Sequence, residues 1–367
     1  MKKIILCFGT RPEAIKMAPL FHYLKNNSPL EIIVCVTAQH REMLDQVLIF
    51  FNIKPDYDLN LMKDNQSLNS LSATILSEMD KVLEFESPDI VLVHGDTTTS
   101  TMVSIAAFHR NIKVGHIEAG LRTYNKMAPF PEEMNRQITS KIADYHFAPT
   151  ILAQNNLLKE GVDSSCILVT GNTVIDALLW TKIKLETGYV HNQITDLIKF
   201  KNIPYILVTG HRRESFGEGF IEFCEALLTI VEETNLEIIF PVHLNPNVQN
   251  TVKKILGNNA KIHLLNPVEY PVLVWLLQHC SLVISDSGGI HEEAPTFQKH
   301  ILVTREVSER PEGVEQGFST LVGTNKKKIV EKAKFFIENG FNPVKENPYG
   351  DGMASHKIAE FLLNQQQ

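Results

Sequence analysis

Short apolar runs alternate along the chain with longer stretches in which apolar residues recur at helical spacing. In the first half, the runs predict buried strands at 3–8, 31–36, 89–94, 112–117, 145–149 and 166–171. Between them, amphipathic stretches predict helices that include 12–25, 41–51, 71–86 and 98–109. Strands that alternate with helices in this way imply an α/β fold with a parallel sheet.

The rhythm starts again after a polar, weakly periodic stretch at 182–202, which we interpret as a linker. Further strands are predicted at 205–210, 236–243, 260–265, 281–286 and 300–304. We therefore expect two Rossmann-like domains with parallel sheets that face a central cleft. Their predicted extents are 1–170 and 171–353, and a C-terminal helix at 354–367 is expected to pack back on the first domain.

Composition narrows the class of protein. The chain has 367 residues, of which 44% are apolar and 21% charged, as expected for globular domains. A net charge of -7 argues against a nucleic-acid partner held by bulk electrostatics. The 5 cysteines form no CxxC pair and indicate reduced thiols in the cytoplasm. No run approaches the roughly 20 apolar residues of a membrane span, so no membrane partner is expected.

Three acids occur at or just beyond junctions between strands and helices. Glu118 ends the apolar run in VGHIEAGLRT, Asp96 follows the strand in DIVLVHGDTTTS, and Glu132 opens a helix in PFPEEMNRQ. A desolvated carboxylate costs several kcal/mol unless it is paired or used. Open α/β sheets carry their ligands at the carboxyl ends of the strands. The acids are therefore candidates for catalysis.

Simpler explanations remain open for two of these acids and for a nearby lysine. Asp96 can cap the helix that starts at 97–100. Glu118 can form a buried ion pair with an arginine such as Arg122. In CFGTRPEAIKMAPL, Pro12 suits the first helical position, and Arg11 and Lys16 would then point toward the cleft; the alternative for Lys16 is a surface lysine.

The second half offers a candidate site for a diphosphate. No G-x-G-x-x-G follows the first strand and no P-loop motif occurs, so no dinucleotide is indicated. Instead, the segment SLVISDSGGIHEEAP leads a strand into Ser287, Gly288 and Gly289, where backbone N–H groups can approach an anion. The groups that could reach this ligand are His211 and Arg310 for the phosphates and Glu293 for a ribose.

These groups also have simpler explanations. Solvated surface charge accounts equally well for Arg212, Arg213 and Arg310, and a helix-face carboxylate accounts for Glu293. Two acid–histidine groupings, His116 with Glu118 and His291 with Glu292 and Glu293, resemble partial metal sites. No third and fourth ligands occur at zinc-like spacing, so no metal is expected.

Taken together, the motifs resemble one family, the non-hydrolysing UDP-N-acetylglucosamine 2-epimerases of bacteria. Blocks similar to that family's occur in order: FGTRPEAIKMAPL, QHREML, HGDTTT, GHIEAGLRT, PFPEEMNR, GNTVIDAL, TGHRRES, DSGGI with EEAP, ERPEG and NPYGDG. The resemblance implies a GT-B type fold with a UDP-binding C-terminal domain, a homodimer and no cofactor. It also implies interconversion of UDP-GlcNAc and UDP-ManNAc for surface polysaccharide synthesis. The chain departs from the family pattern at Ala38 (usually Gly), Leu273 (often aromatic), His291 (usually Gln) and Ser308 (usually Thr).

The chemistry gives the acids a task. The C2 proton of an N-acetylhexosamine has no adjacent carbonyl to acidify it, and without a nicotinamide site, elimination of UDP to 2-acetamidoglucal and re-addition is favoured. Inversion at C2 needs groups on both faces of the sugar. The resemblance assigns acid/base or charge-stabilising roles to Asp96, Glu118 and Glu132, and binding or orienting roles to His211 and Arg136. Which carboxylate takes the proton stays open.

The resemblance also implies two ligand sites. Residues of both domains are expected to line the UDP site, so that binding of UDP closes the cleft. These residues are Arg11, His211, Ser287, Gly288, Gly289, Glu293 and Arg310. Lys16 and Arg136 are expected among the other substrate-binding groups. A second UDP-GlcNAc is expected to act as an activator, held by Gln39, Gln46, Gln66, Arg212 and His243.

Other functions are compatible with parts of the sequence. A UDP-dependent glycosyltransferase would explain the diphosphate site but leave the acids without a task. A hydrolysing epimerase would differ in the fate of the glucal, yet its relatives usually lack TGHRRES and QHREML. A non-catalytic sensor of nucleotide sugars would be expected to lose the three acids, which are all present.

Overall fold

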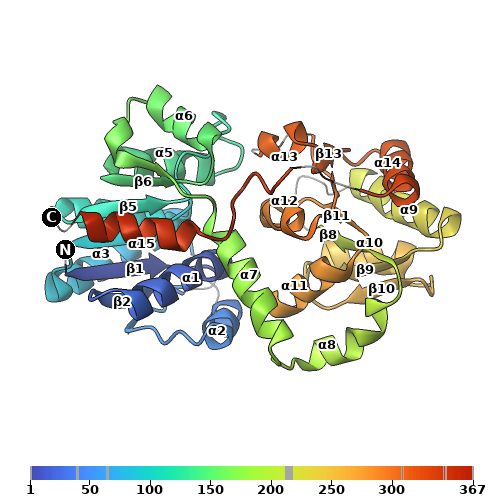
Figure 1. The fold of residues 1–367 in the computed structure, drawn as a ribbon, viewed down its shortest axis with the longest axis horizontal. Coiled ribbons are helices and arrows are strands. Elements are labelled where there is room, and N and C mark those ends of the chain that lie inside the picture. The colour runs from blue at the N-terminus through green and yellow to red at the C-terminus, as the bar shows by residue number, and fades with distance from the viewer. Residues whose placement is uncertain are drawn as a thin grey trace. The chain divides into compact units, whose positions relative to one another are not determined.

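The computed structural model describes residues 2–38, 41–62, 66–210, 218–306, 308, 310–341, 343 and 345–365. The chain divides into two compact units, Met1–Leu179 with Tyr349–Gln367 and Trp180–Pro348. Each unit has its own parallel sheet flanked by helices (Figure 1). The first segment of the first unit therefore ends at Leu179 instead of the expected residue 170. Its second segment begins at Tyr349 instead of the expected residue 354.

The first unit contains a seven-stranded sheet in the order β3-β2-β1-β4-β5-β6-β7. Its strands are β1 (Lys3–Phe8), β2 (Glu31–Val36), β3 (Tyr57–Asp58), β4 (Ile90–His94), β5 (Lys113–Ile117), β6 (Tyr145–Ala148) and β7 (Ile167–Val169). Its helices are α1 (Arg11–Asn27), α2 (Arg41–Phe50), α3 (Leu68–Glu86), α4 (Thr98–His109), α5 (Glu132–Ile142), α6 (Ile151–Lys159), α7 (Thr173–Glu186), which continues into the second unit, and α15 (Ala354–Asn364). Strand order reverses direction between β1 and β4, which is where such sheets bind ligands.

The second unit contains a six-stranded sheet in the order β10-β9-β8-β11-β12-β13. Its strands are β8 (Tyr205–Thr209), β9 (Glu237–Pro241), β10 (Ile262–Leu265), β11 (Leu282–Ser285), β12 (Ile301–Val303) and β13 (Ser319–Leu321). Its helices are α8 (Asn192–Leu197), α9 (Glu218–Glu233), α10 (Pro246–Leu256), α11 (Tyr270–His279), α12 (Gly288–Glu293), α13 (Pro311–Glu315) and α14 (Lys326–Asn339). The order reverses between β8 and β11.

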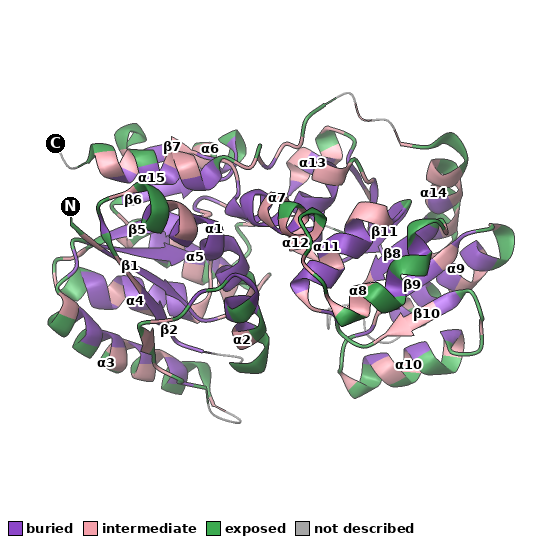
Figure 2. Ribbon diagram, turned by 60° about the horizontal axis from the view of Figure 1, so that its bottom comes forward, coloured by how far each residue is buried: buried purple, intermediate pink, exposed green. Residues whose placement is uncertain are grey.

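Burial explains why these segments form these elements. Every residue of β4 is buried, as expected for a parallel strand covered by helices on both faces. Helices on the outside, such as α3 and α10, alternate buried and exposed positions (Figure 2). Helix α1 begins with a capping box in which Thr10 and Glu13 satisfy each other's backbone N–H groups, so Pro12 occupies the second helical position rather than the first.

Two expectations need correction. The stretch 182–202 is largely helical, because α7 continues to Glu186 and α8 follows, and its irregularly spaced Leu197 and Phe200 pack into the core of the second unit. The short strands β3 and β13 were not predicted, since two or three residues are too few to establish a period.

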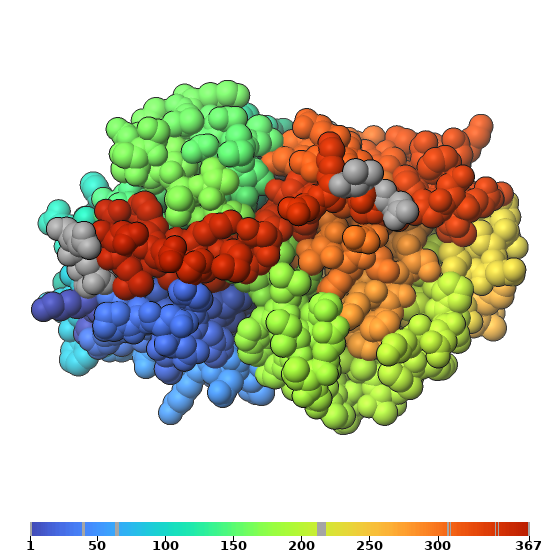
Figure 3. Space-filling model, in the orientation of Figure 1, coloured from blue at the N-terminus to red at the C-terminus, as the bar shows by residue number. Residues whose placement is uncertain are grey.

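Helix α15 packs against α1 and lies at the surface of the first unit (Figure 3). Within the described ranges, we find no helix with both the length and the apolar character needed to cross a membrane.

Candidate active site

The first unit gathers the expected acids at the reversal point of its sheet. Asp96 follows β4, Glu118 follows β5, and Lys16 extends from α1 after β1. The backbone of Glu118 has a φ of 62°, in the left-handed region that a residue with a Cβ rarely adopts. Such strain is held in place only by surrounding structure and collects at functional sites.

The carboxylate of Glu118 is held by two buried partners. Its Oε1 forms an ion pair with Lys16 and accepts a hydrogen bond of 2.7 Å from Asn172 Nδ2. Only 7% of the Glu118 side chain is exposed. Lys16 is therefore not a surface lysine. The buried ion pair allowed for Glu118 exists, but its partner is Lys16 and not Arg122, which pairs with Glu160 at 2.7 Å.

Asp96 lies in a different environment from Glu118. Its Oδ2 accepts a 2.6 Å hydrogen bond from Arg136, and 27% of its side chain is exposed. Burial raises the pKa of Asp96; Arg136 opposes this, and the nearby charges of Glu118 and Glu132 add to it. Thr97, not Asp96, caps α4, because Ser100 N donates to Thr97 Oγ1 at 3.1 Å. The carboxylate of Asp96 is therefore not used as a helix cap.

The start of α5 brings the third acid to the same place. Glu132 is half-buried, and its Oε2 is buried without a hydrogen-bond partner within the described part of the chain. The next residue, Glu133, is fully buried and accepts the N–H groups of Thr123 and Tyr124, each at 3.0 Å. Glu133 thus anchors the loop after β5 to α5.

Sequence reasoning missed three buried residues of this region. Asn172 contacts Glu118, and His94 Nδ1 lies 3.8 Å from Glu118 Oε2. Burial lowers the pKa of His94 to about 3, so its imidazole is neutral at pH 7. Glu13 accepts a hydrogen bond of 2.7 Å from Thr97 Oγ1 and thereby joins the start of α1 to the loop after β4. All three lie inside the motifs GNTVIDAL, HGDTTT and TRPEA, but no spacing rule singles them out.

In the second unit, the residues expected to bind a diphosphate lie around one arginine. Arg310 is buried, and its Nε donates to Glu292 Oε1 at 2.5 Å, so it is not solvated surface charge. A Cβ added to Gly288 would lie 2.6 Å from Arg310 Nη1, so the guanidinium rests on the glycine backbone. Glu293 is also buried, and its carboxylate accepts a hydrogen bond of 2.8 Å from the Tyr270 hydroxyl. The explanation of Glu293 as an exposed carboxylate on a helix face is therefore wrong. Ser287 and Gly289 are half-buried beside Gly288.

The remaining candidate residues are either outside the described residues or at half-buried to exposed positions. Gln39, His211 and Arg212 lie outside the described residues. Gln46 is exposed on α2, Gln66 is half-buried before α3, and His243 is exposed after β9. Arg11, half-buried, is the first residue of α1. In the ranges that the structure describes, no group of three or more His, Cys, Asp or Glu residues is arranged to hold a metal ion.

Two Rossmann-like units, the first with carboxylates grouped after β4 and β5, place the chain in the GT-B structural class. A family model for UDP-N-acetylglucosamine 2-epimerase matches residues 22–363. Proteins of that name from Campylobacter jejuni and Escherichia coli strain K12 are each 50% identical to this chain, over 99% of it and 98% of their own length. The chain belongs to the UDP-N-acetylglucosamine 2-epimerase family, and it is an isomerase that acts on carbohydrates.

Solved structures agree with this assignment. A Neisseria meningitidis UDP-GlcNAc 2-epimerase bound to UDP-GlcNAc is 47% identical, with a TM-score of 0.93 over 99% of this chain and 100% of that one. The Methanocaldococcus jannaschii UDP-GlcNAc 2-epimerase in complex with UDP-GlcNAc and UDP is 33% identical, with a TM-score of 0.86 over 99% of this chain and 100% of that one.

Proposed function

We propose that this protein reversibly epimerises UDP-N-acetylglucosamine at C2 to UDP-N-acetylmannosamine, by elimination and re-addition of UDP, for synthesis of a bacterial surface polysaccharide. The observation that carries the mechanism is the grouping of three carboxylates, in which the charges of Glu118 and Glu132 both act on Asp96. Transfer of a sugar to an acceptor would need no such grouping. Inversion of a carbon centre does, because proton donors and acceptors must serve both faces.

The proposed steps balance without a cofactor. A carboxylate takes the C2 proton, the C2–H electron pair becomes the C1–C2 double bond, and UDP leaves C1 with the electrons of the C1–O bond. A phosphate oxygen of UDP then attacks C1, and the double-bond electrons take a proton on the opposite face of C2. Glu118 is held in an ion pair with Lys16, whereas burial raises the pKa of Asp96. Carboxyl groups with different environments can take different roles in proton transfer.

We propose that the diphosphate of UDP binds in the second unit against Arg310, Ser287, Gly288 and Gly289, with Glu293 receiving the ribose. The support is the buried guanidinium of Arg310, which lies on the bare backbone of Gly288. Charge-assisted bonds from arginine to phosphate are strong and directional. His211 and Arg11, and Arg136 and Lys16 for the sugar, complete the proposed substrate-binding set.

Three broader proposals come from the resemblance to the family. UDP-GlcNAc activates its own conversion through a second site that includes Gln46, Gln66 and His243, together with Gln39 and Arg212. The protein works as a homodimer. It acts in the cytoplasm, in keeping with its unpatterned free cysteines.

Proton NMR in deuterated water tests the mechanism. UDP-GlcNAc incubated with the enzyme and no added NAD should yield UDP-ManNAc that carries deuterium at C2, because a proton abstracted by a carboxylate exchanges with solvent. A product that keeps its original C2 hydrogen would exclude elimination. Release of free ManNAc would indicate a hydrolysing enzyme instead.

A further inference from the structure

Asn172 occupies a junction between the candidate acid site and two distant segments of the chain. Its side chain is buried at the start of α7, where Oδ1 accepts the N–H of Val174 at 3.1 Å and Nδ2 donates to Glu118 Oε1 at 2.7 Å. Its backbone N–H donates to Tyr349 O at 2.7 Å. Because the side-chain oxygen of Asn172 accepts a hydrogen bond from the backbone, its side-chain NH2 group must point the other way, toward the carboxylate of Glu118.

The packing around Asn172 leaves it little freedom. A Cβ on Gly350 would lie 3.3 Å from Asn172 N and 3.4 Å from Gly171 Cα, so two backbones cross here in direct contact. One turn further along α7, Asp176 accepts the N–H groups of Ala354 at 3.2 Å and Ser355 at 2.7 Å. The start of α7 is therefore fixed to the segment that returns to the first unit.

These two segments are the places where the chain passes between its units. Helix α7 contains the junction between Leu179 and Trp180, and Tyr349 is the first residue after the return. We propose that Asn172 is a positioning residue for the epimerase reaction: its amide fixes the Glu118 carboxylate and makes the placement of that carboxylate depend on both connecting segments. The inference rests on the catalytic role proposed above for Glu118.

Asn172→Asp separates the two functions of the side chain. An aspartate keeps an oxygen for the N–H of Val174, so the start of α7 is preserved, but it places an anionic acceptor where Glu118 Oε1 needs a donor. We expect kcat to fall about 10- to 100-fold, as for a misplaced catalytic group. KM for UDP-GlcNAc and the affinity for UDP should change by less than about twofold, because the amide contacts neither in the proposed site.

Asn156→Asp is the matched control. Asn156 is similarly buried in the first unit, but its Nδ2 donates to a backbone carbonyl, Gly120 O at 3.0 Å, rather than to an acid. Thermal unfolding should show comparable destabilisation of both variants, whereas only Asn172→Asp should lose kcat strongly. Equal losses of kcat in the two variants would overturn the inference, since general loosening of the first unit would then explain both.

A double-mutant cycle decides whether Asn172 acts through Glu118. In a Glu118→Gln background, Asn172→Ala should lower kcat by much less than it does in the parent. If Asn172→Ala lowered kcat by the same factor in the Glu118→Gln background as in the parent, Asn172 would act independently of Glu118. That result would overturn the proposal. The proposed function can fail separately: a fully active Glu118→Gln enzyme would remove the role of Glu118 itself, whatever Asn172 does.

Discussion

At the scale of single residues, two strand ends depend on backbone conformations that their side chains disfavour. Ala38 has a φ of 52° and Glu118 a φ of 62°. The left-handed region costs a residue with a Cβ roughly 1–2 kcal/mol relative to glycine's freedom there. Glycine, the residue that the resemblance leads us to expect at the position of Ala38, would adopt this conformation without that cost. At Glu118 the strained residue is an acid held by Lys16 and Asn172, which fits a role in chemistry.

Replacing each acid by its amide tests the residue-scale assignment. Asp96→Asn, Glu118→Gln and Glu132→Gln should each lower kcat by about 10²-fold or more, as expected for acid/base groups, while UDP still binds. Steady-state kinetics and titration calorimetry with UDP measure the two quantities. Glu225→Gln, at a half-buried position of α9 where the carboxylate pairs with Lys326, serves as the control and should retain activity. Near-parent turnover in any of the three would assign that carboxylate to structure.

Removing Arg310 tests the proposed diphosphate site. Arg310→Ala should weaken UDP binding roughly 10- to 100-fold, the loss expected for a charge-assisted hydrogen bond. Because this change also leaves Glu292 buried without its partner, the double variant with Glu292→Gln is measured beside it, with thermal unfolding as a check on folding. Parent-like affinity for UDP in a folded double variant would show that the phosphates bind elsewhere.

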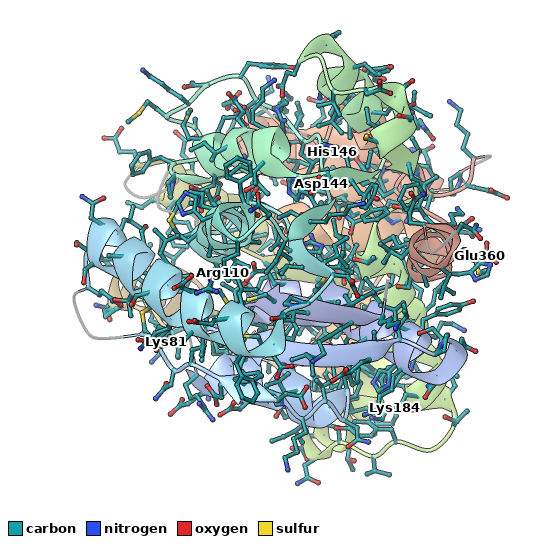
Figure 4. All side chains as sticks on the ribbon, turned by 90° about the vertical axis from the view of Figure 1, so that its left-hand side faces the viewer. Lys81, Arg110, Asp144, His146, Lys184 and Glu360 are labelled. Carbon is teal, nitrogen blue, oxygen red and sulfur yellow. The ribbon has the colours of Figure 1, made fainter. Side chains whose placement is uncertain are left out.

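At the scale of elements, three neighbouring strands carry buried histidines. Burial lowers the pKa of His94 on β4 and His116 on β5 to about 3. It lowers the pKa of His146 on β6, which is labelled in Figure 4, to about 4. The unfolded chain protonates these rings near pH 6.5, so it binds more protons than the folded unit below that pH. The free energy of unfolding should therefore fall as pH decreases from about 6.5 toward 4, by up to about 1.4 kcal/mol per pH unit for each histidine.

Hydrogen exchange of peptides covering β4 to β6 can measure this pH dependence, since it reports the local free energy of opening. His146→Gln removes one of the three rings and should reduce the slope against pH. Surface residue His109, at the end of α4, provides the control as His109→Gln. An unchanged slope in the His146 variant would mean that this ring does not contribute to acid destabilisation.

The contact between α7 and α15 gives a second prediction for elements. Helix α15 has no side-chain cap of its own, and Asp176 of α7 accepts two N–H groups of its first turn. Asp176→Ala should destabilise the first unit by about 1–2 kcal/mol, the usual effect of losing a cap. Exchange of the α15 amides should rise most. Asp176→Asn, which keeps one acceptor oxygen, should lie between Asp176→Ala and the parent, and equal exchange in all three would contradict the assignment.

At the scale of the whole molecule, the proposed activation by UDP-GlcNAc predicts an unusual rate curve. A ligand shifts a conformational equilibrium only by its differential affinity for the two states. Purified UDP-ManNAc alone should therefore turn over slowly until a trace of UDP-GlcNAc is added. Gln46→Ala and His243→Ala should weaken this response without removing basal activity. Immediate full-rate turnover of UDP-ManNAc would exclude activation.

The sequence by itself determined the class of fold and was enough to select the acids as candidates. Periodicity is a local property, so the repeated strand and helix patterns were sufficient to predict two parallel α/β units. Asp96 and Glu118 could be singled out because a charge directly after an apolar strand is costly unless it is used. Very short strands such as β3 escaped prediction, since their pairing depends on a neighbouring strand and not on their own pattern.

Only the tertiary structure decided which partner each charge has. Lys16 and Glu118 are 102 positions apart, and Asn172 and Glu118 are 54 apart, so no local pattern could have paired them. The same is true of Arg122, which the sequence allowed beside Glu118 and which the structure gives to Glu160. Strand order places the loops after β1, β4 and β5 side by side, and β7 leads to Asn172. Partner choice is a property of that arrangement, because ion pairs and hydrogen bonds form between groups that the fold brings within a few ångströms.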